Sequence, residues 1–98
     1  MAKEIKWTTE AEEKFDEIVI YLEKNWTANE VEKFIEATTK VLNYISEYPL
    51  MFRKSKKKNI HEALITEKQL LIYKVKPQHI ELITFWDNRQ NDISKKYI

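Results

Sequence analysis

The sequence predicts an α+β fold in which a helix hairpin packs on one face of a four-stranded, mainly antiparallel sheet. Two observations lead to this prediction. Apolar residues recur every three or four positions between residues 9 and 47, and they alternate with polar residues beyond residue 59. The first spacing is typical of amphipathic helices and the second of strands. The expected order is β-α-α-β-β-β, and we expect residues 1–98 to form a single domain.

The N-terminal quarter contains a short strand followed by a helix start. Residues 3–7 alternate and are expected to form the first strand, with Trp7 interpreted as a core residue. Thr9 is followed three residues later by Glu12, which is the pattern of a capping box. We therefore expect the first helix to begin at Thr9 and to end near Asn25.

A second helix is expected after a connection of about two residues. Thr27 and Glu30 repeat the capping-box pattern, and Trp26 is interpreted as a core residue placed to form a hydrophobic staple. Pro49 ends the helix, because the residue before a proline avoids helical geometry. Helices joined by so short a connection are expected to form an antiparallel hairpin.

The C-terminal half is expected to be a meander of three strands. Residues 50–58 are interpreted as a connector, and strands are predicted at about 59–66, 69–75 and 79–86. Short polar turns separate the strands, so neighbouring strands pair antiparallel. The first strand is expected to join this meander, which completes the sheet.

Glycine is absent from the chain, so positions with positive φ must be taken by other residues. Asparagine tolerates the left-handed region better than other residues with a side chain. Four asparagines lie where chain reversals or ends are expected, and they are Asn25, Asn59, Asn88 and Asn91.

A net charge of +1 conceals an asymmetry between the two halves. Residues 8–47 hold ten acids and four bases, whereas residues 48–98 hold eleven bases and five acids. The C-terminal half is therefore the better candidate for contact with an acidic partner. Its densest basic run consists of Arg53, Lys54, Lys56, Lys57 and Lys58.

Composition also excludes several classes of protein. There is no cysteine, which excludes disulfides and thiolate metal sites, and we expect no metal and no cofactor. The start, “MAKEIKW”, lacks the apolar region of a signal peptide, and the apolar runs are far too short to cross a membrane. We expect a soluble, cytoplasmic protein.

Five motifs follow one another along the chain. They are “WTT” at the first helix, “IVIYLEKNW” at its end, “ISEYP” at the end of the second helix, “LLIYKV” and “IELITFWDNRQN”. In this order and at this chain length, they resemble the RelE/ParE superfamily, the toxins of type II toxin–antitoxin (plasmid stabilization) systems. The chain departs from the pattern at Asp92, where relatives often carry proline, and at “HEA”, where they often carry arginine.

The resemblance implies growth arrest by one of two activities. RelE-like members are ribosome-associated mRNA endonucleases, whereas ParE-like members poison DNA gyrase and lack the nuclease residues. The spacing in “YLEKNW” and the long helix hairpin are more similar to ParE. We therefore expect a gyrase-binding inhibitor more than an enzyme, neutralised by a cognate antitoxin. A ribosome-dependent ribonuclease and an inert relative that only binds an antitoxin remain alternative hypotheses.

If the chain is a metal-independent ribonuclease, it needs a base, an acid and a cation near one phosphate. The candidates are His61, Glu62 and His79. The antiparallel meander places both histidines and the basic run toward one end of the sheet. The simpler interpretation is that His61 is a surface strand residue and that His79 is an exposed turn residue.

Candidate binding residues are the basic run and the end of the last strand. The basic run is either a solvated loop or a contact for phosphates or for an acidic antitoxin segment. Trp86 is expected to be half-buried at the end of the last strand, where it would cover the apolar residues beneath it. Arg89 either stabilises the C-terminal turn or contacts a partner. We interpret “WDNRQN” as a strand stop first and a binding contact second. One helix hairpin cannot cover both apolar faces of the sheet, so an antitoxin segment with acidic residues and apolar anchors is expected on the uncovered face.

Overall fold

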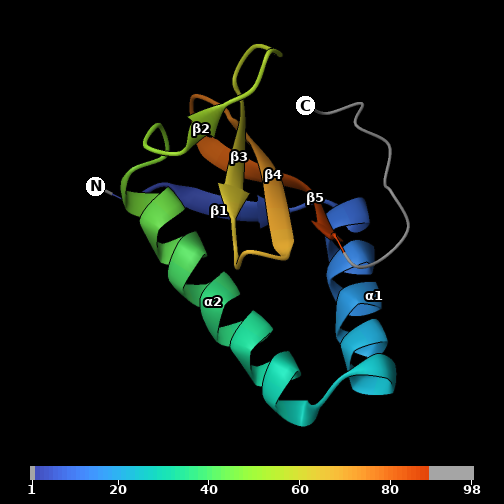
Figure 1. The fold of residues 1–98 in the computed structure, drawn as a ribbon. Coiled ribbons are helices and arrows are strands. Elements are labelled where there is room, and N and C mark those ends of the chain that lie inside the picture. The colour runs from blue at the N-terminus through green and yellow to red at the C-terminus, as the bar shows by residue number, and fades with distance from the viewer. Residues whose placement is uncertain (1, 89–98) are drawn as a thin grey trace.

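The computed structural model describes residues 2–88, in which two helices and five strands form one α+β unit (Figure 1). The order is β1 (Glu4–Trp7), α1 (Thr9–Asn25), α2 (Ala28–Glu47), β2 (Arg53–Lys54), β3 (Ile60–Leu64), β4 (Gln69–Val75) and β5 (His79–Asp87). The predicted fold class and the predicted order of elements are confirmed. One strand was not expected, because β2 forms within the segment interpreted as a connector.

The strands form a single mixed sheet in the order β1-β5-β4-β3-β2. β1 joins the meander by pairing parallel to β5, and the other neighbours pair antiparallel. β5 contains a bulge, because Ile72 pairs with Thr84 whereas the next residue, Tyr73, pairs with Leu82. The extra residue, Ile83, is consistent with a local kink that strengthens the twist of the strand.

The two helices are joined only by Trp26 and Thr27, as the sequence predicts, and Figure 1 shows them diverging toward the sheet. Thr27 caps α2 by accepting a hydrogen bond from the Glu30 N–H at 3.2 Å. The cap predicted for α1 was wrong by one residue, because the hydroxyl of Thr8, and not of Thr9, accepts from the Ala11 N–H at 3.0 Å. Thr8 takes this position because its hydroxyl also donates to the Leu82 carbonyl of β5, at 2.8 Å.

The main core lies between the helix hairpin and one face of the sheet. Its aromatic centre consists of Phe15, Phe34 and Phe85, whose ring centroids lie 5.0 to 6.4 Å apart in stacked and edge-on pairs. Trp7 stacks on Phe85 at 5.3 Å but is 36% exposed, so it lies at the rim of this core and is not the buried core residue that was expected. Such pairs add to the stabilisation that burial provides. The aliphatic part of this core includes Ile18, Leu22, Val41, Ile45, Leu71, Ile80 and Leu82.

The opposite face of the sheet has its own apolar cluster and no helix over it within residues 2–88. Ile60, Ile72 and Trp86 are buried there, with Leu70 and Ile83 packed against them. We call this the open face. Its existence confirms that the hairpin covers one side of the sheet only.

Two further expectations have clear outcomes. Asn59 has φ of 63° and is the residue that takes the left-handed region within residues 2–88, as the absence of glycine predicts for one of the asparagines. Trp26 is not a core residue, because 45% of it is exposed and the Lys68 ammonium lies 5.7 Å from its ring centroid. No helix within residues 2–88 is both long and apolar enough to cross a membrane.

Candidate functional site

A pocket of about 430 Å³ lies where the open face meets the β2 edge of the sheet. Its walls are Phe52, Leu64 and Leu70, and its polar residues are Arg53 and Glu62. Strand alternation explains the set, since Arg53 pairs with Glu62 across β2 and β3, and residues directly opposite each other point to the same face. The apolar walls of this pocket could not be predicted from the sequence, because nothing in the pattern around Leu64, at the end of a predicted strand, indicates which edge of the sheet it occupies.

The carboxylate of Glu62 is the unusual group in this pocket. Only 7% of the residue is exposed, and its Oε2 atom is buried without a hydrogen-bond partner. Its Oε1 atom lies 3.8 Å from Arg53 Nε, which is too long for a hydrogen bond. Arg53 is itself 79% exposed, so this ion pair is weakly held and contributes little on its own. A buried carboxylate oxygen that lacks a donor is costly.

His61 lies on the helix side of the sheet, opposite Glu62. It is 4% exposed, so the expectation of a surface strand residue was wrong. Its ring stacks on Tyr73 with centroids 5.3 Å apart, and its Nδ1 atom has no hydrogen-bond partner. Burial, and after it the charge of Lys54, lowers the pKa of His61 from 6.5. Burial also raises the pKa of the Tyr73 hydroxyl, which donates to the Pro49 carbonyl at 2.7 Å.

The structure does not bring the three candidate catalytic residues together. His79 is the first residue of β5 and is partly buried beside Glu4 of β1, so the expectation of an exposed turn residue was wrong. His61 pairs with Tyr73, which pairs with Leu82, three residues beyond His79. Two strand spacings and three residues of rise separate the two histidines by about 14 Å. Glu62 points to the other face.

The basic run forms β2 and the tight loop that joins it to β3. Ser55 organises this loop, because its hydroxyl accepts from the Lys57 N–H at 3.0 Å and its own N–H donates to the Ile60 carbonyl at 2.8 Å. Lys56, Lys57 and Lys58 are all exposed, and the loop projects past the end of the sheet (Figure 1). We call residues 53–58 the basic loop. It is positioned to attract anions before contact.

A network of hydrogen bonds fixes the end of β5. Asp87 is fully buried and accepts a hydrogen bond of 2.7 Å from the Gln69 amide. The Trp86 indole donates to Asn88 at 2.8 Å, and the Asn88 N–H donates to the Lys68 carbonyl at 2.7 Å. The interpretation of this motif as a strand stop is therefore supported. Trp86 is buried in the open-face cluster and not half-buried, and Arg89 lies outside the described residues.

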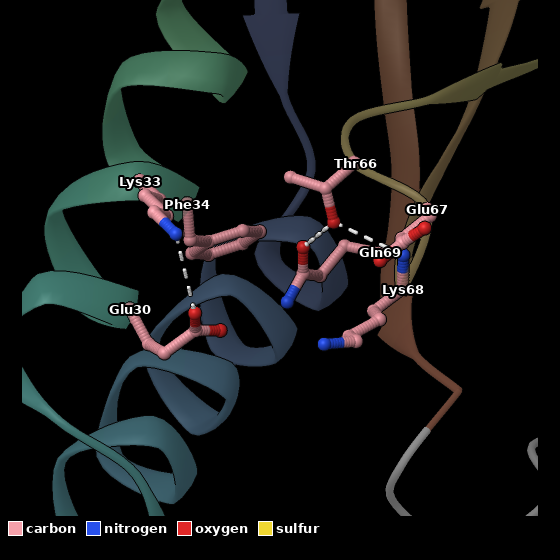
Figure 2. Close-up of a pocket in the computed structure, with 7 residues that line it drawn as sticks. All are labelled: Glu30, Lys33, Phe34, Thr66, Glu67, Lys68 and Gln69. Atoms are coloured by element: carbon pink, nitrogen blue, oxygen red, sulfur yellow. Dashed lines mark hydrogen bonds and ion pairs between the residues drawn. The ribbon is translucent and has the colours of Figure 1, made fainter.

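A smaller pocket of about 130 Å³ lies between α2 and the turn that joins β3 to β4 (Figure 2). Figure 2 shows an ion pair from Lys33 to Glu30 on one side and the Thr66 hydroxyl linking Gln69 to the Lys68 N–H on the other. Small-molecule sites are usually larger than about 300 Å³. We interpret this pocket as part of the hydrogen-bond network at the end of β5, since Gln69 also binds Asp87. Within residues 2–88, no group of three or more histidine, aspartate or glutamate side chains is arranged to hold a metal ion.

Comparison with known families identifies the chain. A family described as “ParE toxin of type II toxin-antitoxin system, parDE” matches residues 5–92. The chain belongs to the ParE toxin family. This agrees with the resemblance to the RelE/ParE superfamily that its motifs indicate. No curated protein sequence matches the chain.

Several solved structures share the fold of this chain. The chromosomal ParDE system of P. aeruginosa superposes with a TM-score of 0.72 at 16% identity, covering 88% of this chain and 96% of that chain. The YoeB dimer of Staphylococcus aureus gives 0.62 at 18% identity, covering 86% and 94%. The DinJ-YafQ complex of E. coli gives 0.61 at 8% identity, covering 91% and 96%. At these identities the likeness concerns the fold alone.

Proposed function

We propose that this ParE-family chain arrests growth by binding and inhibiting DNA gyrase, and that a cognate antitoxin neutralises it by covering the open face. Membership of the ParE family supports a gyrase target, because the ParE-like branch of the superfamily is the one associated with gyrase. Two of the similar structures are described as a ParDE system and a DinJ-YafQ toxin–antitoxin complex, which supports an antitoxin partner.

The observation that carries the proposal is the dispersal of the titratable groups. A metal-independent nuclease needs its base and acid within about 3–3.5 Å of the reacting atoms. His61 is buried against Tyr73, Glu62 lies on the opposite face, and His79 is about 14 Å away by strand geometry. A binding inhibitor tolerates such dispersal, since an interface of about 800 Å² per partner can span both edges of a sheet.

The open face supports the antitoxin part of the proposal. Its buried cluster of Ile60, Ile72 and Trp86 is flanked by Leu64, which is 62% exposed, and by the basic loop. The exposed side chain of Leu64 beside these cations fits a segment that carries an apolar anchor and acidic residues. Trp86 contributes from within the cluster, by shaping the surface on which a partner lies.

The residues proposed to contact the antitoxin or the target directly are cations. They are Arg53, Lys54, Lys56, Lys57 and Lys58, which the structure gathers in the basic loop, and Arg89. Arg89 stays a sequence-based proposal.

The test is supercoiling by purified gyrase with the chain added, alongside a translation-coupled mRNA cleavage assay with the same preparation. We expect supercoiling to fall, or cleaved DNA to accumulate on gyrase, while the message stays intact. Preincubation with the antitoxin should restore supercoiling. Message cut at codon-spaced positions with gyrase unaffected would refute the gyrase proposal and favour the RelE-like ribonuclease. Neither effect, together with antitoxin binding, would favour the inert relative.

A further inference from the structure

We propose that the outer edge of β3 at Leu64 accepts an extended segment of a protein partner as an additional strand, with a side chain that donates a hydrogen bond to Glu62. In the complex proposed above this segment would belong to the antitoxin. The identity of the partner, but not the strand-binding edge itself, therefore rests on the proposed function.

The first observation is an unpaired stretch of sheet edge. β2 is only two residues long and covers β3 at His61 and Glu62. Backbone groups alternate sides along a strand: the Ile65 N–H donates toward β4, to Gln69, whereas Ile60 bonds on the β2 side, to Ser55 and Lys57. The N–H and C=O of Leu64 therefore point outward, and no strand in residues 2–88 lies beyond β2 on that side.

The second observation is that this edge separates two concave surfaces. On the open face is the pocket of about 430 Å³ with Glu62 in its lining. On the helix side is a groove of about 440 Å³ between α2 and the end of β3, lined by Val41, Tyr44 and Ile65 among others. A strand directs successive side chains to opposite faces. A strand paired with Leu64 would therefore place one side chain in the pocket and its two neighbours toward the groove.

The chemistry of the pocket selects the side chain that faces it. Phe52, Leu64 and Leu70 offer apolar contact, and the Oε2 atom of Glu62 lacks a donor. A long side chain with an aliphatic stem and a donor at its tip satisfies both, and arginine does so with a charge that pairs with the carboxylate. Arg53 is 79% exposed and can move toward solvent as this donor arrives.

A second copy of the chain is a poor fit for this edge. In the copy, β2 and the basic loop would cover the same side of β3. Only a very short ladder of backbone hydrogen bonds could therefore form between the two chains. Pairing would also bring two basic loops together, and two Glu62 carboxylates would still lack donors. A single extended peptide brings no second basic loop and can supply the donor that Glu62 lacks, and recognition of this kind is a recurring mode of peptide binding.

The probe is the synthetic peptide acetyl-Thr-Val-Arg-Val-Thr-amide, titrated into the full chain and followed by NMR and by hydrogen exchange. We expect saturable shifts at β3 and slower exchange of the Leu64 amide. The same peptide with glutamine in place of arginine should bind more weakly, and with glutamate weaker still. Glu62→Gln should weaken the arginine peptide by about tenfold or more, whereas Glu67→Gln, in the nearby turn, should not.

The backbone contribution is isolated by Leu64→Pro, which removes the outward N–H and leaves the bonds to β4 in place. Its matched control, Leu64→Ala, keeps that N–H. We expect at least about a tenfold larger loss of affinity for the proline variant than for the alanine variant. N-methylation of the peptide arginine removes the opposing N–H without altering the protein, so the test does not depend on folding of the variant.

Equal binding of the glutamate peptide would overturn the role of Glu62, and affinity unchanged by both Leu64→Pro and N-methylation would overturn strand addition. Self-association that Leu64→Pro abolishes would assign the edge to a second copy and also refute the proposal. A chain that leaves gyrase active but binds the arginine peptide as described would refute the proposed function and support the strand-binding edge.

Discussion

His61 couples stability to pH, because it is buried with an unpartnered ring nitrogen. Burial and the neighbouring Lys54 lower its pKa from 6.5 in the folded chain, so the folded state favours the neutral ring. Below pH 6.5 the unfolded chain binds the proton more readily than the folded chain does. The stabilisation is fully present above pH 6.5 and is lost as the pH falls through the folded-state pKa. Urea unfolding across pH 4.5–8 should show this loss.

The variant His61→Phe keeps the stacking on Tyr73 and removes the proton-binding nitrogen. We expect it to flatten the decline in unfolding free energy below pH 6.5. His79→Gln is the matched control, since it removes the other imidazole of the chain and should leave the decline in place. A decline that persists in His61→Phe would show that other groups cause it.

Asp87 is predicted to stabilise the fold through the amide of Gln69. The residue is fully buried, and the hydrogen bond of 2.7 Å links the ends of β4 and β5. Asp87→Ala should lower the free energy of unfolding by roughly 2 kcal/mol, because it leaves a buried amide without its acceptor. Asp87→Asn keeps an acceptor and should lose less. Equal losses in thermal or urea unfolding would indicate that the negative charge, and not the acceptor, matters.

At this scale, sequence alone identifies the polar residues but not their surroundings. Asp87 was correctly interpreted as part of a strand stop, because polar residues after an alternating run indicate where a strand ends. His61 was misplaced, because the alternation of β3 does not say which of its two faces a helix covers. Glu62 was noted as a titratable group, but its unpartnered oxygen depends on Arg53 and on the edge position of β3, which only tertiary structure reveals.

The two helix caps should differ in their effect on stability. Thr8 accepts from the Ala11 N–H and also donates to Leu82 of β5, whereas Thr27 makes only the capping bond among those observed. We expect Thr8→Ala to cost about 2 kcal/mol and Thr27→Ala about 1 kcal/mol. Thr39→Ala, on an exposed part of α2, should stay within about 0.5 kcal/mol of the parent. Equal costs for the two cap variants, by thermal unfolding, would contradict a linking role for Thr8.

Elements with a regular pattern were predicted well, including the four-residue β1, whereas the two-residue β2 was not. The helices and the three meander strands agree with their predicted bounds to within two residues, because many residues contribute to each period. β2 has only two residues and is charged, so no periodicity could reveal it. It forms because the tight loop around Ser55 returns the chain onto β3. Its shortness in turn leaves the Leu64 edge unpaired.

At the scale of the whole molecule, the helix hairpin covers one of the two apolar faces of the sheet. Within residues 2–88 no helix lies over the second face, and its buried cluster around Ile72 lies next to the pocket at Glu62 and the basic loop. The acidic helices lie on the other side of the sheet. The charge asymmetry of the sequence therefore corresponds to a separation in space, because the basic loop projects past the end of the sheet whereas the acidic helices pack on one of its faces.

This separation predicts that the basic loop steers an acidic antitoxin segment. Replacing Lys56, Lys57 and Lys58 with glutamate should slow association by about tenfold at low salt and blunt its salt dependence, because long-range attraction acts mainly on the rate of encounter. A control triple on the other side of the chain, Lys6, Lys14 and Lys24 to glutamate, changes the net charge equally and should slow association less. Stopped-flow association at about 20 and 200 mM salt distinguishes the two, since the longer screening length at low salt strengthens steering. Equal slowing by both triples would mean that net charge alone governs encounter, and unchanged rates for the loop triple would remove the basic loop as the steering element.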